Sequence, residues 1–170
     1  MLSRANGQSD FTKLTFSASR LQHIVGNLNL LVAASGQYAF DPLLSSEEFG
    51  LGGPEFLRAF DPSEAVGDHG LAGRIELQYL VPIGFDFLDT IQLYGFGDAG
   101  RVWNEDADFG EVERETLSSA GAGVRFTVNE HVRGGIEIAV PIEGEVAAEE
   151  LHEDGSGDEP RIFGTISLTF

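Results

Sequence analysis

Long segments of this chain alternate between apolar and polar residues, and a period of two residues predicts β-strands. In residues 71–81, Leu71 and Ile75 belong to an apolar set, while Arg74 and Glu76 belong to the intervening polar set. The same alternation recurs along the chain and predicts seven strands, over residues 11–20, 27–40, 69–81, 90–104, 116–129, 131–142 and 161–170. Glycine and aromatic enrichment agrees with this pattern, with 22 Gly and 13 Phe. The fold class we expect is therefore all-β and antiparallel.

The predicted strands are long, and the connections between them alternate in length. Most of the strands reach the roughly nine to eleven residues that a tilted strand needs to cross a bilayer, whereas soluble strands average about five or six. Short turns are predicted at residues 21–26, 82–89 and 129–131, and long loops at 41–68, 104–115 and 143–160. Short turns at one end and long loops at the other are typical of a transmembrane β-barrel. The sequence contains no run of 18 apolar residues, so it predicts no membrane-spanning helix.

The two faces of the predicted strands are expected to lie in different environments. In a membrane barrel the apolar set faces lipid and the polar set faces a wet lumen, whereas a soluble sandwich or barrel buries the apolar set. Strand length and loop asymmetry favour the membrane interpretation. The charged residues expected to face the lumen are Arg74, Glu76, Asp98, Arg125, Arg133 and Glu137. Aromatic residues near predicted strand ends fit interfacial girdles, namely Tyr38, Phe40, Tyr79, Phe85, Phe87, Trp103 and Phe170.

The net charge of −18 belongs to the loops and not to the strands. The three long loops hold 21 of the 28 acidic residues and only two of the ten Lys and Arg residues. A nucleic-acid partner is excluded, because phosphate binding needs the opposite charge. We interpret the acidic loops as solvated connections, with a role in binding divalent cations or a partner as the alternative.

The sequence contains no recognisable set of catalytic residues. The chain has no Cys, so neither disulfides nor thiolate metal sites are predicted. His23, His69, His131 and His152 are scattered over different strand ends and loops, with no nucleophile and base in a common pattern. We therefore predict no enzyme activity, catalytic residue, metal site or cofactor.

Two motifs stand out from the alternating pattern. The first is a glycine-rich segment, Gly50-Leu51-Gly52-Gly53, followed by the tetrad Leu57-Arg58-Ala59-Phe60, and both lie in the long loop 41–68. The second is Phe96-Gly97-Asp98-Ala99-Gly100, within the predicted strand 90–104. A loop arginine and an aspartate on the lumen-facing set make a plausible ion pair, since a buried guanidinium needs a carboxylate to offset its desolvation.

The order of several short motifs resembles a known family. The set comprises Ser35-Gly36-Gln37-Tyr38-Ala39, Pro42–Phe49, the two motifs above, Arg74-Ile75-Glu76-Leu77 and a terminal Phe170. Together they resemble the C-terminal half of two-partner secretion transporters of the haemolysin-activator and haemagglutinin-transporter type. These belong to the superfamily that also contains BamA-like barrel-assembly proteins. The resemblance covers about residues 11–170.

The resemblance implies a barrel of about sixteen strands in the outer membrane of a Gram-negative bacterium. It also implies that loop 41–68 folds into the lumen and sets Arg58 against Asp98 on the barrel wall. The family usually has glycine after the arginine, and Ala59 departs from that pattern. If the loop tip needs a positive φ there, alanine costs about 1 kcal/mol or more. Ile166, Leu168 and Phe170 resemble the C-terminal signal that barrel-assembly machinery reads.

Seven strands leave two open sheet edges, which lipid cannot satisfy. We therefore expect the chain to be the C-terminal piece of a longer protein, with two such chains closing one barrel as the alternative. Residues 1–10 are expected to be disordered or to begin a loop, and 1–8 lack the apolar core of a secretory signal. The expected partners are secreted polypeptide cargo, outer-membrane lipid, barrel-assembly machinery and the remainder of the barrel.

Translocation of an unfolded, adhesin-type or haemolysin-type polypeptide across the outer membrane is the function we expect from the resemblance. A barrel-assembly insertase of the same superfamily is the first alternative, and a passive porin or structural barrel is the second. A soluble β-barrel that acts as a binding module is a third, which the strand lengths disfavour.

Overall fold

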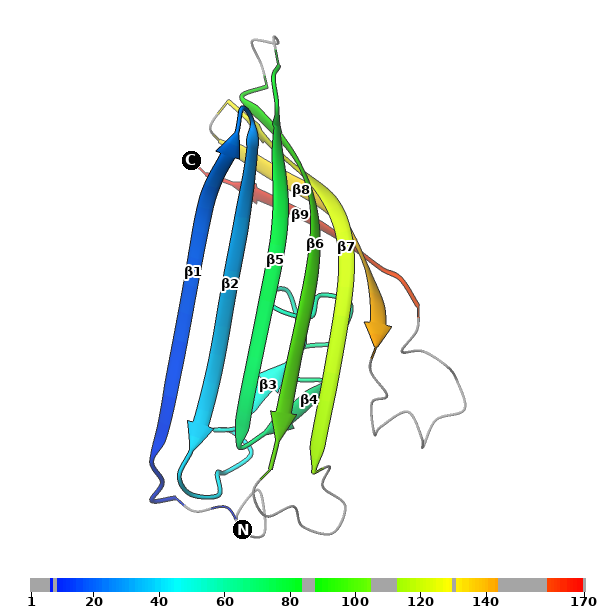
Figure 1. The fold of residues 1–170 in the computed structure, drawn as a ribbon. Coiled ribbons are helices and arrows are strands. Elements are labelled where there is room, and N and C mark those ends of the chain that lie inside the picture. The colour runs from blue at the N-terminus through cyan, green and yellow to red at the C-terminus, as the bar shows by residue number, and fades with distance from the viewer. Residues whose placement is uncertain are drawn as a thin grey trace.

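The structure is a computed structural model that describes residues 7, 9–83, 88–104, 113–129, 131–143 and 159–169. Seven long strands form one antiparallel sheet in the order β1-β2-β5-β6-β7-β8-β9 (Figure 1). The strands are β1 (Lys13–Val25), β2 (Leu28–Ala39), β5 (His69–Val81), β6 (Thr90–Trp103), β7 (Arg114–Val128), β8 (Val132–Glu143) and β9 (Arg161–Leu168). Each strand pairs with the next long strand along the chain, so the sheet is a simple meander. The all-β, antiparallel expectation is confirmed.

The sheet curls into an open trough and does not close. In Figure 1, β8 and β9 pass behind the plane of β1, β2 and β5, and the two outermost strands are β1 and β9. The C-terminal end lies at the end of the sheet with the short turns, and the N-terminal end lies with the long loops (Figure 1). No helix in the described residues has the length and apolarity needed to cross a membrane.

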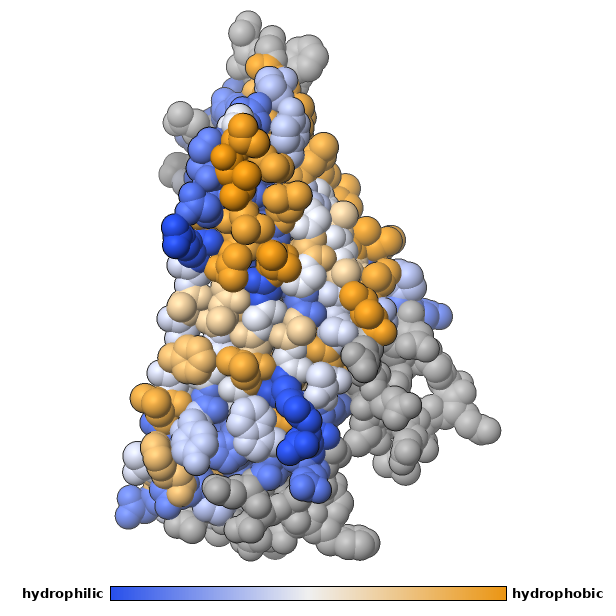
Figure 2. Space-filling view, in the orientation of Figure 1, coloured by the Kyte–Doolittle hydropathy of each residue, from blue (hydrophilic) through white to orange (hydrophobic). Residues whose placement is uncertain are grey.

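The polarity of the curled sheet is the reverse of that of a soluble domain. Its concave face buries polar side chains, namely Gln37, Glu76, Gln78, Asp98 and Ser119. Its convex face exposes large apolar side chains, such as Ile75 at 52%, Ile136 at 59% and Ile162 at 73% of their surface (Figure 2). An apolar surface of this extent is not stable in water and needs an apolar surrounding. The arrangement disfavours the soluble-barrel alternative, which would bury this set.

A second, small sheet lies on the concave side. Its strands are β3 (Phe49–Leu51) and β4 (Ala65–Gly67), which pair antiparallel and lie behind β5 and β6 in Figure 1. Both belong to the loop 41–68, whose own strand content was not predicted from the sequence. Their side chains contribute to the only extensive hydrophobic cluster of the described residues, which the loop forms together with the inner faces of β5, β6, β7 and β8.

Two sequence predictions of local structure are wrong. The first strand was expected to end at residue 20, and a turn was expected over 21–26. Instead β1 continues to Val25, and the turn consists only of Gly26 and Asn27. Gly26 has a φ of 57°, which allows the tight hairpin turn, and backbone pairing with β2 outweighs the polar side chains. The predicted acidic loops 104–115 and 143–160 lie largely outside the described residues.

Candidate functional site

The loop between β2 and β5 is fixed at its base by polar contacts. The Leu43 backbone N–H donates to Asp68 Oδ1 at 2.9 Å, and the Asp68 backbone N–H donates to Asn104 Oδ1 at 2.9 Å. Gln37 on β2 donates from Nε2 to the Glu47 carbonyl at 3.0 Å. These contacts turn the chain back over the concave face, so that residues 49–67 lie on it instead of extending past the strand ends.

Apolar contacts then seat the middle of the loop on β6. Leu51 and Leu57 are both buried, and both approach Gly100. A Cβ at residue 100 would lie 2.7 Å from Leu51 Cδ2 and 3.0 Å from Leu57 Cδ1, so any larger residue there would force these leucine side chains to shift. Phe60 and Ala59 lie in the same hydrophobic cluster. Gly100 therefore provides the surface on which the loop rests.

The backbone strain at the loop tip differs from the sequence expectation. The positive φ falls on Leu57, at 62°, and not on Ala59. Leu57 tolerates this conformation because its side chain is fully buried against Gly100. Residue 59 therefore does not need a left-handed backbone conformation, and alanine in place of the family's glycine causes no strain there. Two glycines nearby, Gly52 and Gly53, have φ values of 104° and 100° and allow the chain to turn before the tetrad.

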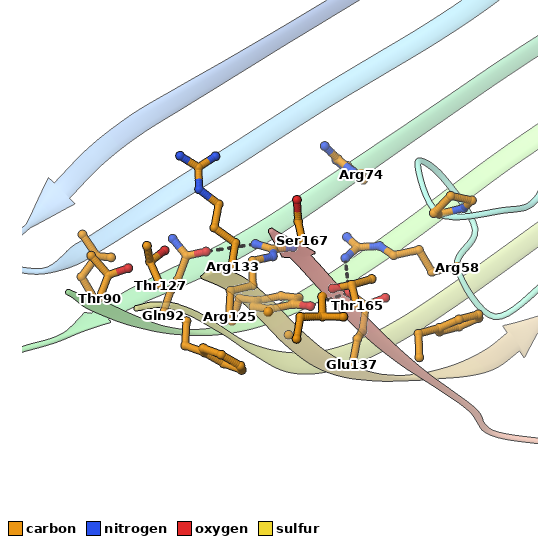
Figure 3. Close-up of a pocket in the computed structure, with 18 residues that line it drawn as sticks. Arg58, Arg74, Thr90, Gln92, Arg125, Thr127, Arg133, Glu137, Thr165 and Ser167 are labelled. Carbon is orange, nitrogen blue, oxygen red and sulfur yellow. Dashed lines mark hydrogen bonds and ion pairs between the residues drawn. The ribbon is translucent and has the colours of Figure 1, made fainter. Parts of the chain in front are cut away.

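Arg58 extends from the loop tip into a group of carboxylates on the concave face. Its Nε lies 3.2 Å from Asp98 Oδ2, and its two terminal nitrogens lie 2.6 Å from Glu137 Oε2 and 3.1 Å from Glu76 Oε2. The guanidinium carbon lies 3.5 Å from the centre of the Phe96 ring, which adds a cation–π contact. The resemblance paired Arg58 with Asp98 alone, and the structure brings three carboxylates to it, from β5, β6 and β8. Figure 3 shows Arg58 extending from the loop, with Glu137 below it.

A second arginine extends the same network towards the short-turn end of the sheet. Arg125 of β7 holds Glu76 with two contacts, at 2.6 and 3.1 Å, and lies 3.6 Å from the centre of the Tyr94 ring. Tyr94 donates its hydroxyl to Glu137 Oε2 at 2.7 Å. Gln78 and Gln92 complete the network by donating to Glu76 Oε1 and to Gln78 Oε1, respectively. Three carboxylates and two guanidiniums are thus cross-linked across four strands and the loop, which we name the arginine cluster (Arg58, Glu76, Asp98, Arg125 and Glu137).

The other sequence-predicted residues lie at different places. Arg74 donates to the Glu55 carbonyl at 2.9 Å and so contacts the loop directly, while Arg133 lines the trough without joining the arginine cluster (Figure 3). Gly97 lies on the convex face, opposite to the loop, although it belongs to the same motif as Asp98. Ile166 and Leu168 of the expected assembly signal are exposed on the convex face of β9. Phe170 lies outside the described residues.

The trough beside the arginine cluster is hollow. A cavity of 570 Å³ extends from Pro54 and Arg58 of the loop to the short-turn ends of β5, β6 and β9, and many of its lining groups are hydroxyls, amides and guanidiniums. Among the described residues, no group of His, Asp and Glu side chains is arranged to hold a metal ion. The arrangement can therefore hold a loop in place and present polar groups to the trough.

An exposed ion pair ties the far side of the loop to the last strand. Arg161 of β9 donates from both terminal nitrogens to the carboxylate of Asp61, and this hydrogen bonding lowers the pKa of Asp61 below its ordinary value. Because the folded-state pKa is the lower one, the pair stabilises the loop above the ordinary carboxyl pKa of about 4 and is lost as the pH falls through the folded-state value. The contribution is small because the pair is exposed.

We predict that Asp61→Asn removes this acid-dependent part of the stability. Melting temperatures of the detergent-solubilised protein should converge for wild type and Asp61→Asn as the pH is lowered below about 4, after a small difference at pH 7. Arg161→Gln should match Asp61→Asn at pH 7, since either change breaks the same pair. A constant difference between wild type and Asp61→Asn across this pH range would show that the ion pair does not contribute.

A protein-family model and a solved structure both match this chain. Residues 2–126 match the model for a family described as haemolysin secretion/activation protein ShlB/FhaC/HecB. Among solved structures, the chain resembles CdiB from Escherichia coli, with a TM-score of 0.78 and 22% identity, over 99% of this chain and 30% of the CdiB chain. At this identity the likeness shows the fold, and the chain spans about 30% of the length of that structure. A comparison with curated proteins found no match.

An antiparallel sheet with an apolar convex face, a polar concave face and an inward-folded loop is the construction of a membrane β-barrel wall. The family match narrows this class. The matched segment covers well over half of the chain, so this chain belongs to the haemolysin secretion/activation family, ShlB/FhaC/HecB, whose members are two-partner secretion transporters of the outer membrane.

Proposed function

We propose that this chain forms part of an outer-membrane pore that moves an unfolded polypeptide in two-partner secretion. In this proposal the seven-stranded sheet is one section of the barrel wall and its concave face lines the pore. Loop 41–68 occupies the pore and is held there by the arginine cluster. The cargo is a secreted protein of the adhesin or haemolysin type, and the protein is located in the outer membrane of a Gram-negative bacterium.

The observation that carries this proposal is the position of the loop on the concave face. Its side chains bury the hydrophobic cluster against β5, β6, β7 and β8, and its arginine joins carboxylates from three strands. A loop held so firmly across the trough controls what passes through it. The cavity that remains includes hydroxyl, amide and guanidinium groups among apolar side chains, and these polar groups can hydrogen-bond to an extended backbone.

Two other functions give different expectations. A barrel-assembly insertase of the same superfamily would act on other membrane proteins, and the match to a secretion family favours transport over this role. A passive porin would use the trough for small solutes. The loop would then set the pore size, and its removal would raise solute flux without affecting any exported protein.

Secretion by cells with and without this protein separates these functions. We expect the cognate cargo in the medium when the protein is present, and in the periplasm when it is absent, with the levels of other outer-membrane proteins unchanged. A general loss of outer-membrane barrels would indicate an insertase instead. An unchanged distribution of all exported proteins, together with reduced uptake of small solutes, would indicate a porin.

A further inference from the structure

Two arginines face outwards on the convex side, where apolar residues predominate. Arg101 of β6 and Arg114 of β7 are both exposed, and strand register sets Trp103 opposite Arg114 and Leu71 opposite Arg101 on the same face. Neither guanidinium forms an ion pair with any residue that the structure describes. A charge on the outer face of a membrane barrel is unfavourable unless it lies at the level of the lipid headgroups.

The level of these arginines is marked by a row of aromatic rings. Tyr38 contacts Phe40, with ring centres 5.1 Å apart, and His69, with centres 4.7 Å apart. His69 in turn stacks on Trp103 at 5.4 Å. Rings of this kind gather at the membrane–water interface, because they are apolar with a polar edge. The row lies at the loop ends of β2, β5 and β6, so Arg101 and Arg114 lie at the interface on the long-loop side.

A hollow begins at the two arginines and extends over the apolar face. It has a volume of 650 Å³, and its floor consists of small residues, Ala34, Gly73 and Ala99, beside Leu71. A second hollow of 410 Å³ shares Gly73 and Ala99 and continues past Gly97. Figure 2 shows the corresponding pattern, with hydrophilic residues near the loop ends of the strands and paler, small residues next to them. A charged head and a groove over small side chains match the two parts of a lipid.

We propose that this surface binds a phosphorylated acyl lipid of the outer leaflet. Arg101 and Arg114 hold the lipid phosphate, since guanidinium matches phosphate in charge and geometry. One acyl chain lies in the groove over Gly73, Ala99 and Gly97, where larger side chains would fill the space. The ligand is a lipid and not a free phosphate, because the groove continues onto the membrane-facing surface. The inference rests on the outer-membrane location given under the proposed function.

Lipid retained by the protein tests this proposal. The protein is purified from outer membranes in a mild non-ionic detergent, and bound lipid is identified by native mass spectrometry. We expect wild type to keep a phosphorylated lipid, and the double variant Arg101→Gln with Arg114→Gln to bind it about thirtyfold more weakly. The matched variant Arg101→Lys with Arg114→Lys keeps the charge and should retain most of the lipid. Ala99→Leu fills the groove without changing charge and should also lose the lipid.

The same experiment distinguishes the ways in which the proposal can fail. Equal lipid retention by wild type and the double Gln variant, or binding of inorganic phosphate alone, would overturn it. Retention by Ala99→Leu would overturn the acyl-chain assignment. Titration of wild type with the phosphorylated lipid and with its dephosphorylated form gives a readout without any variant, and equal binding of both would also overturn it. Cell fractionation that places the protein elsewhere would contradict the proposed function instead.

Discussion

Arg58→Ala is expected to release loop 41–68 from the concave face and to abolish most cargo secretion. The substitution leaves Glu76, Asp98 and Glu137 close together, with Arg125 paired to Glu76 and Arg74 opposite Asp98 as the remaining nearby guanidiniums. Removing one partner from a buried ion pair costs about 3–5 kcal/mol, and here one residue serves three partners. The sheet itself keeps its backbone pairing, so the barrel should still insert. The measurement is cargo in the medium at equal amounts of folded barrel.

Two further variants test the reason for this effect. Arg58→Lys keeps the charge but lacks the planar set of donors that reaches three carboxylates, so it should restore only part of the secretion. Exchanging the residues, as Arg58→Asp with Asp98→Arg, should restore little, because Glu76 and Glu137 would then face a new carboxylate. Full recovery by the exchange would mean that Arg58 and Asp98 act as an isolated pair. Wild-type secretion by Arg58→Ala would contradict the role of the cluster.

Gly52→Ala is expected to disrupt the loop nearly as strongly as the loss of Arg58. A Cβ at residue 52 would lie 1.9 Å from the Asp61 carbonyl oxygen, which is backbone and cannot rotate away. The two sides of the loop would have to separate, and this would lift Leu51 and Leu57 from Gly100. We expect the loop to become susceptible to protease added from outside the cell, with secretion reduced by at least tenfold, which corresponds to about 1.4 kcal/mol.

The neighbouring glycine supplies a matched control for this prediction. Gly53 has nearly the same φ, but a Cβ there would lie 3.5 Å from its nearest neighbours, at ordinary contact distance. Gly53→Ala therefore carries only the backbone strain, of about 1–2 kcal/mol, and not the clash. Protease sensitivity should be clearly greater for Gly52→Ala than for Gly53→Ala. Equal sensitivity of the two variants would show that the close approach to Asp61 does not hold the loop.

The alternation of residues was sufficient to predict the main sheet. The strand over 69–81 has the predicted bounds, and the opposite faces follow because successive side chains in a strand point to opposite sides. The wrong prediction of a turn at residues 21–25 also comes from relying on this alternation. Alternation weakens where β1 carries polar residues, and pairing with β2, which the local pattern does not reveal, extends the strand.

The arginine cluster could be predicted only in part. Glu76 and Glu137 were placed on the lumen-facing set, yet nothing in their spacing indicates that they reach Arg58, because the residues lie 18 and 79 positions away from it. The support of the loop by Leu51 and Leu57 on Gly100 was also missed. A glycine within a strand signals that another group approaches closely, but it does not identify that group.

The proposed role of loop 41–68 requires that the loop lies on the concave face within the membrane. The chain has no Cys, so a pair of introduced cysteines can be cross-linked without background. We would measure cross-linking of the double variant Asp61→Cys with Arg161→Cys by a short bifunctional thiol reagent in intact outer membranes. The control is the double variant Asp61→Cys with Ile162→Cys, because Ile162 faces outwards. A loop on the concave face predicts efficient linkage at 161 and little at 162. Equal linkage at both positions, or linkage at 162 alone, would contradict it.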